Sequence, residues 1–317
     1  MKLSIQDMAN QYRKIRKSVF IDATAPNSKV TEQHIHNQKK LKSGIIDLCD
    51  DKADLSRLDN SGIENDVWEH MWKKIRYAGI KAVLAGQEIE DIEFYFNQYQ
   101  HFLSKDWDIK SKGHELISAG SKVMNFKQRT GIFTNKLTVG NVPKLKRTVN
   151  LARGYSVHLA NGGSVKSFLI GDNNISDVWA IHQHLQRNSG YGAQITTLHL
   201  MMDLGFSVVK PDIILTRLFV EKGWLQSRYS DLPNDLSNDD IVGRGKYRSK
   251  YTYTKPLMYK RVIDLANEIV AACNQVELED DIGWVTNNPL REFDIFMVKY
   301  AQVPEEKYGL VRTLYSS

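Results

Sequence analysis

Long apolar segments are missing from this sequence. No run of about 18 or more consecutive apolar residues occurs in it, which argues against a transmembrane helix. Residues 1–17 also lack the apolar core and the small-residue cleavage site of a secretory signal peptide. The sequence therefore predicts a cytoplasmic protein with no membrane partner.

Cysteine is scarce as well. The chain has two cysteines, Cys49 and Cys273, which are too few for a four-cysteine zinc or iron–sulfur site. A reducing compartment disfavours a disulfide between them, so we expect two buried thiols. We interpret the histidines in helical segments as hydrogen-bonded helix residues rather than metal ligands; these are His182, His184 and His199. Neither a metal nor a cofactor is expected.

Proline and strand-like alternation are both infrequent. There are seven prolines among 317 residues, and the clearest alternating pattern is the short YTYT at 251–254. Apolar residues instead recur at helical spacing through most of the chain. The segments with this pattern are 66–84, 91–103, 176–186, 194–205, 211–225, 259–273 and 288–300. The sequence therefore predicts an all-α fold.

Three regions are expected within this helical chain. Residues 1–60 carry many charges and weak apolar patterning, so we interpret them as an N-terminal helical extension. Residues 61–225 form the helical core. Residues 226–317 comprise a basic-aromatic loop and C-terminal helices that pack with the N-terminal part. Loops are expected at 24–31, 226–256 and 278–289.

Positive charge is present in modest excess. The net charge is +6 and the pI is ≈ 9.0, which fits a polyanionic partner. Basic residues gather in two runs, 144–147 and 244–255. In the second run Tyr247, Tyr251 and Tyr253 interleave with the cations, a mixture that suits phosphate contact and stacking on bases. Both runs are also compatible with ordinary solvated faces.

The segment 185–218 has the most informative pattern. It consists of a helix, the tight turn Ser189-Gly190-Tyr191-Gly192, a second helix, a short connection and a third helix that Pro211 and Asp212 open. Two glycines permit a sharp hairpin whose backbone N–H groups point outward at the start of a helix, where they can bind phosphate. Such a site holds a DNA strand without reading its sequence. Pro211 suits the first turn of the third helix.

The residues SGYGAQ followed by VVKPDIILTRL resemble the helix-hairpin-helix signature of the endonuclease III-like DNA glycosylase superfamily. In that family a Gly-x-Gly hairpin is followed, two residues later, by a position that is lysine in bifunctional members, and then by an aspartate. Here these positions hold Gln194 and Asp212, which are 18 residues apart. The resemblance implies two helical subdomains flanking a DNA-binding cleft, with the hairpin motif at about 185–205.

The resemblance also implies roles for individual residues. Asp212 and Gln194 occupy the catalytic positions, and Gln87 lies where a side chain enters the space left by a flipped base. DNA is the expected partner, and no obligatory protein partner is expected. Together with the two basic runs, the hairpin gives the predicted DNA-binding set: Ser189, Gly190, Tyr191, Gly192, Ala193, Lys144, Lys146, Arg147, Lys210, Arg244, Lys246 and Arg248.

The implied activity is that of a monofunctional DNA glycosylase. Cleavage of a glycosidic bond develops positive charge on the sugar, which a fixed carboxylate such as that of Asp212 stabilises while it orients or deprotonates water. The base must first leave the stack. Gln194 replaces the lysine that would form a Schiff base, so no lyase step is expected. The substrate stays open among alkylated, deaminated and oxidised bases, with a hypermodified phage base such as glucosylated hydroxymethylcytosine as a further alternative that would imply antiviral defence.

Plainer interpretations stand beside these. Asp212 can serve only as a helix cap, and the two glycines can form an ordinary turn between helices. Gln194 and Gln87 can be polar residues at helix ends. The rival function is a catalytically inactive helix-hairpin-helix module that binds DNA.

Overall fold

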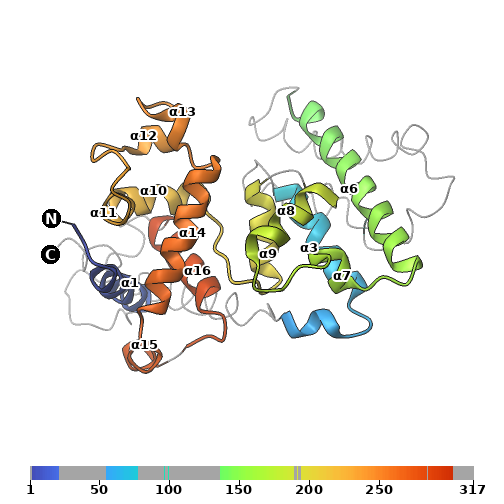
Figure 1. The fold of residues 1–317 in the computed structure, drawn as a ribbon, viewed down its shortest axis with the longest axis horizontal. Helices are drawn as coiled ribbons and strands as arrows, with labels where there is room; N and C mark the ends of the chain where they lie inside the picture. The colour runs from blue at the N-terminus through green and yellow to red at the C-terminus, as the bar shows by residue number, and fades with distance from the viewer. Residues whose placement is uncertain are drawn as a thin grey trace, which may run out of the picture. The chain divides into compact units, whose positions relative to one another are not determined.

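The computed structural model describes residues 2–20, 55–77, 96, 99, 136–188, 191, 194–283 and 285–302. This part of the chain is helical and contains no β-strand, which confirms the all-α class (Figure 1). Among these described residues, no helix combines the length and the apolar character needed to cross a membrane.

The chain divides into two compact units. Unit 1 consists of Met1–Ala53 and Ser207–Ser317, and unit 2 consists of Asp54–Phe206. Unit 1 is therefore built from the two ends of the sequence, whereas unit 2 is continuous. Residues 207–225, which the sequence analysis grouped with the preceding helices, belong to unit 1.

Unit 1 is a bundle in which the N-terminal helix packs against C-terminal helices. Its helices are α1 (Ile5–Phe20), α10 (Ile213–Glu221), α11 (Trp224–Arg228), α12 (Asn238–Ile241), α13 (Arg248–Tyr251), α14 (Pro256–Ala271), α15 (Gln275–Ile282) and α16 (Pro289–Gln302). Helix α1 contacts α14, α15 and α16, and α10 contacts α16 and α14. Within this unit α12 and α13 lie at one end and α15 at the other (Figure 1).

Aromatic rings fill the interior of unit 1. The ring of Phe293 lies 4.6 Å from that of Tyr12 and 6.0 Å from that of Phe219, measured between centroids. Phe219 in turn meets Trp224 edge to face at 5.2 Å. Because these residues come from α1, α10, α11 and α16, burial of their rings holds helices from both ends of the chain together.

A buried ion pair crosses the same interface. Arg16 on α1 is 0% exposed, and its guanidinium contacts the carboxylate of Glu292, a residue 3% exposed. The hydroxyl of Tyr12 and the backbone N–H of Thr286 also donate to Glu292, each at 3.3 Å. Burial raises the pKa of Glu292, although the nearby guanidinium opposes the rise. Both charged groups therefore have hydrogen-bonding partners within the protein, which a charge removed from water requires.

Unit 2 packs its helices around a second aromatic core. Its elements are the 3-10 helix η1 (Leu55–Asp59), α3 (Glu64–Tyr77), α6 (Lys136–Ala160), α7 (Val165–Ile170), α8 (Val178–Asn188) and α9 (Gln194–Asp203). Helix α3 contacts α6 and α9, and α8 contacts α7 and α9. Tyr155 meets Phe168 edge to face at 5.0 Å, and the indole N–H of Trp68 donates to the carbonyl of Phe96.

Three local expectations were wrong. The acidic stretch 278–289 was predicted as a loop, but α15 occupies its first part, because Asn274 caps the helix start and Gly283 ends it at φ 66. The helix expected over 211–225 is broken into α10 and α11 by Gly223 at φ 67. The loop expected over 226–256 contains two short helices, α12 and α13.

Candidate functional site

The connection between α9 and α10 is held in place before it reaches Asp212. Val208 and Val209 are each 0% exposed, and Pro211 is buried. The backbone N–H of Lys210 donates to Oδ1 of Asp294, a buried residue of α16, at 2.8 Å. The chain that leads to Asp212 is therefore anchored on a neighbouring helix, which limits where the Asp212 side chain can lie.

Asp212 is the N-cap of α10. Its backbone is extended, at φ −75 and ψ −178, and its Oδ1 accepts hydrogen bonds from the amides of Ile214 at 2.9 Å and Leu215 at 3.0 Å. These amides are among the donors that a helix start leaves without an intrahelical partner. Pro211 precedes the cap and does not lie in the first turn, where the sequence pattern placed it.

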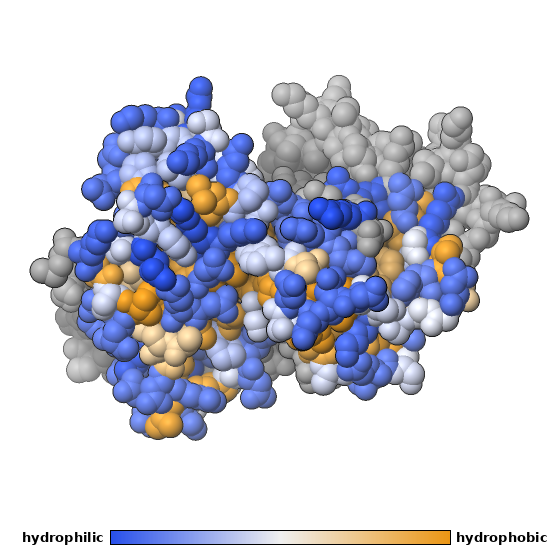
Figure 2. All heavy atoms as spheres, in the orientation of Figure 1, coloured by the Kyte–Doolittle hydropathy of each residue, from blue (hydrophilic) through white to orange (hydrophobic). Residues whose placement is uncertain are grey.

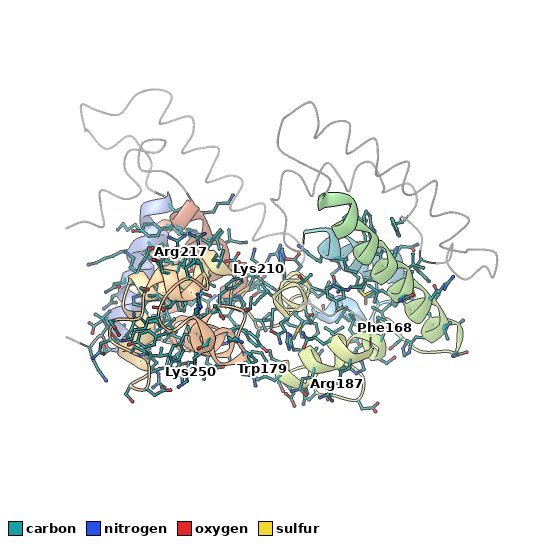
Figure 3. All side chains as sticks on the ribbon, turned by 90° about the horizontal axis from the view of Figure 1, so that it is seen from above. Phe168, Trp179, Arg187, Lys210, Arg217 and Lys250 are labelled. Atoms are coloured by element: carbon teal, nitrogen blue, oxygen red, sulfur yellow. The ribbon has the colours of Figure 1, made fainter. Side chains whose placement is uncertain are left out.

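The second carboxylate oxygen of Asp212 faces a cation. Its Oδ2 lies 3.2 Å from Nζ of Lys210, and the two side chains are 19% and 22% exposed. Figure 3 labels Lys210 in unit 1. The structure thus brings together two of the residues predicted from sequence, one as a catalytic carboxylate and one as a DNA contact.

This arrangement has definite chemical capacities. The carboxylate is fixed in orientation by two backbone amides and stays partly open to solvent. Such a group can stabilise a developing positive charge or accept a proton from water, because it needs no reorganisation during the reaction. The adjacent ammonium of Lys210 can bind an anion such as phosphate.

The two helices of the predicted hairpin are α8 and α9 of unit 2. They are joined by a hydrogen bond between Nε2 of His182, which is 2% exposed, and the carbonyl of Gln194 at 3.1 Å. This contact fits the interpretation of His182 as a hydrogen-bonded helix histidine. His184 likewise bonds through Nε2 to the carbonyl of Phe168 at 3.0 Å. Gln194 is half-buried and is the first residue of α9.

Tyr191, the residue between the two hairpin glycines, is directed into the core. It is 0% exposed, and its hydroxyl donates to the carbonyl of Met71 on α3. Burial raises the pKa of this phenol well above its ordinary value. The side chain of Tyr191 therefore belongs to the core of unit 2, and a role in DNA binding would fall to the backbone of this residue. The neighbouring predicted residues Ser189, Gly190, Gly192 and Ala193 lie outside the described residues.

The structure describes only some of the remaining predicted DNA contacts. Lys144, Lys146 and Arg147 all lie in α6, but only the side chain of Arg147 is described, and it is half-buried. Gln87 lies outside the described residues. The cations Arg244, Lys246 and Arg248 belong to unit 1 and are exposed.

Sequence reasoning missed a polar cluster between α3 and α9. Nζ of Lys74 contacts Oδ2 of Asp203 and lies 3.0 Å from Nε2 of His199. The i,i+4 spacing of His199 and Asp203 places both on one face of α9, but nothing near Lys74 in sequence marks it as their partner. The cluster fastens α9 to α3. No group of three or more histidine, cysteine or carboxylate residues in the described ranges could hold a metal ion.

The thiol of Cys273 is not suited to nucleophilic chemistry. Burial raises its pKa from 9.0 to about 11, and the thiol donates to the carbonyl of Ile269 at 3.3 Å. Because only the thiolate is a good nucleophile, this cysteine is largely unreactive near neutral pH. Cys49 lies outside the described residues.

Alkylation by iodoacetamide tests this statement. At pH 8 we expect Cys273 in the native protein to react roughly 100-fold more slowly than in urea-unfolded protein, because a two-unit rise in pKa lowers the thiolate fraction by that factor. Its rate should keep rising about tenfold per pH unit up to pH 10, whereas a thiol with a pKa near 9 levels off. Peptide mass spectrometry separates the two cysteines. A native rate equal to the unfolded rate at pH 8 contradicts the prediction.

Comparison with known proteins gives no match to this chain, whether among protein-family models, curated proteins or solved structures.

Proposed function

We propose that this protein is a monofunctional DNA glycosylase with a helix-hairpin-helix fold, which flips a modified or damaged base out of DNA and removes it by hydrolysis. The observation that carries the proposal is the carboxylate of Asp212. It is fixed at the start of α10, partly open to solvent, at the sequence position where this class has its catalytic aspartate.

The hairpin supports the proposal from unit 2. Helix α9 begins at Gln194, two residues after the second glycine of the Gly-x-Gly pattern, so the backbone amides of its first turn follow the glycines. Amides at a helix start attract phosphate through hydrogen bonds and the helix dipole. The buried side chain of Tyr191 contacts α3, which leaves the backbone of this residue as the proposed DNA contact.

The proposed reaction breaks the bond between the sugar and the base. The base departs with the electron pair of the N-glycosidic bond and takes up a proton, while water adds to C1′ of the sugar and gives up a proton. Asp212 stabilises the positive charge on the sugar and accepts the proton of the water. The Lys210 ammonium, 3.2 Å from that carboxylate, is placed to contact a phosphate of the same nucleotide strand.

A base-release assay tests this activity. The protein is incubated with a panel of DNAs carrying alkylated, deaminated or oxidised bases, and with phage DNA that contains glucosylated hydroxymethylcytosine. Mass spectrometry of the filtrate identifies the free base. Release of one base class supports the proposal, and absence of release from every DNA that the protein binds contradicts it.

The product should be an intact abasic strand. Gln194 has an amide in place of an amine, so it cannot form an imine with C1′, and scission should require added alkali. Denaturing gels before and after alkali measure this directly. Borohydride is the control, because it traps imines covalently. A trapped protein–DNA adduct would contradict the prediction and direct attention to another lysine, with Lys210 first.

A specific observation favours a second candidate, a DNA-binding module without catalysis. Both oxygens of Asp212 already have partners, since Oδ1 caps α10 and Oδ2 faces Lys210. A purely structural role would account for both contacts. Base release separates the two candidates, because the module would bind DNA without releasing any base.

A further inference from the structure

The segment between α11 and α14 folds around one buried carboxylate. Asp240 is 2% exposed; its Oδ1 accepts from the backbone N–H of Tyr247, and its Oδ2 accepts from the N–H of Ser237 at 3.0 Å. Gly245 lies so close that a Cβ there would be 2.3 Å from Oδ1 of Asp240. Residues 237–255, here termed the α12–α13 segment, therefore have a defined backbone shape and present their charges from fixed positions.

The cations of the α12–α13 segment differ in whether they have partners. Lys246 lies 3.9 Å from a carboxylate oxygen of Asp235, and its ammonium is 4.7 Å from the ring centroid of Tyr247. Four other exposed cations have no ion pair with any residue that the structure describes: Arg244, Arg248, Lys250 and Lys255, of which Lys250 lies 5.1 Å from the ring centroid of Tyr251. These four residues, termed the open cations, are therefore available to an external anion.

Two of the three tyrosines in the segment, Tyr247 and Tyr251, have side-chain partners within unit 1. Tyr251 is 4% exposed, and its hydroxyl donates to the carbonyl of Asp231 at 3.4 Å. The hydroxyl of Tyr247 donates to Oδ1 of Asp235 at 2.9 Å. The rings of both tyrosines pack against lysine ammoniums within the segment. Stacking of DNA bases on these two rings, as the sequence pattern indicated, would compete with these contacts, whereas the open cations are exposed to an external polyanion.

The surface around the open cations is hydrophilic. Figure 2 colours the part of unit 1 over α12 and α13 mostly blue. Among the described residues the exposed large hydrophobic side chains are Val157 and Val276, and neither lies in the segment. A membrane-binding surface inserts apolar side chains beside its cations. This surface has no exposed large apolar side chain among the described residues, and its five cations outnumber the exposed carboxylates of Asp235 and Asp239, which suits a hydrated polyanion.

We propose that the open cations bind the sugar–phosphate backbone of DNA without reading its sequence. They would form a second contact area of unit 1, in addition to Lys210. The proposal rests on DNA being the substrate of the proposed glycosylase. Arginine and lysine on a fixed backbone neutralise phosphates and release counterions, which strengthens binding to every sequence alike. The area would thus hold the strand while Asp212, in the same unit, acts on one nucleotide.

The test compares two double variants of the full-length protein with equal charge change. One is Arg248→Gln/Lys250→Gln, which removes two open cations. The matched control is Lys14→Gln/Lys17→Gln, which removes two exposed lysines of α1 in the same unit. Fluorescence anisotropy measures the affinity for two DNA duplexes of unrelated sequence at salt concentrations from about 50 to about 200 mM. Vesicles containing phosphatidylserine test the alternative partner.

The proposal predicts a weaker affinity for both duplexes, by roughly 10- to 100-fold at about 0.1 M salt, and a log–log salt slope reduced by roughly 0.9 per lost contact. The control should stay within about threefold. Equal affinity of Arg248→Gln/Lys250→Gln and wild type overturns the inference, and so does a loss of vesicle binding with unchanged DNA binding. If the wild type releases a base while the variant binds normally, only this inference fails. If the wild type neither binds DNA nor releases a base, the proposed function fails.

Discussion

Asp212→Asn is expected to abolish base release while the protein stays folded and binds DNA within a few-fold of wild type. Asparagine keeps an oxygen that can accept from the amides of Ile214 and Leu215, and it is among the preferred N-cap residues. What it lacks is the negative charge. Removal of one electrostatic stabiliser costs on the order of 10²-fold or more in rate. Single-turnover base release, with enzyme in excess, measures that rate.

Asp212→Ala is the companion variant, because it separates capping from catalysis. Alanine removes the cap and should lower the free energy of unfolding by about 1 kcal/mol, in addition to removing the charge. If Asp212 serves only as a cap, Asp212→Asn should release bases at a rate within about threefold of wild type. The rate of Asp212→Ala should then fall only as far as its lower stability reduces the amount of folded protein. That result would remove Asp212 from the mechanism and favour the catalytically inactive module.

The second large effect concerns the buried ion pair of unit 1. Glu292→Gln leaves the fully buried guanidinium of Arg16 without its counterion, so we expect the free energy of unfolding to fall by about 3–5 kcal/mol. Arg16→Met should have a similar cost, because it leaves the carboxylate of Glu292 unpaired. The double variant Arg16→Met/Glu292→Leu should cost less than the sum of the single variants, since no charge then remains without a partner.

Hydrogen exchange followed by mass spectrometry measures this effect where it arises. Peptides from α1 and α16 should lose protection, and peptides from α9 in unit 2 provide an internal control that should change little. A cost below about 1 kcal/mol for both single variants would contradict the assigned importance of the pair, because such values are typical of exposed ion pairs.

Local sequence patterns predicted much of the secondary structure near the site. Helices α8 and α9 begin and end close to the segments with apolar periodicity, and the alternative interpretation of Asp212 as a cap describes its hydrogen bonds. Capping and periodicity are properties of a few consecutive residues, so one sequence is enough to predict them. The same kind of signal, Asn274 before and Gly283 after, was present for α15 but was obscured by the acidic composition between them.

The contacts that position the site could not be predicted in the same way. Asp294 accepts from the N–H of Lys210 across 84 residues of sequence. Nothing close to either residue marks them as partners, because the contact depends on how α16 packs against the bundle. The buried hydroxyl of Tyr191 is a similar case, since a tyrosine between two glycines is compatible with either solvent or core. Its partner, the carbonyl of Met71, lies 120 residues away.

The discontinuous construction of unit 1 has a consequence for biosynthesis. Arg16 of α1 meets Glu292 of α16 across 276 residues, whereas unit 2 is one continuous stretch. During translation the whole of unit 2 therefore leaves the ribosome before the partners of α1 exist. We expect unit 2 to fold first and α1 to dock last. The face of α1 that packs against α14 and α16 should therefore stay exposed, and accessible to chaperones, until those helices have been made.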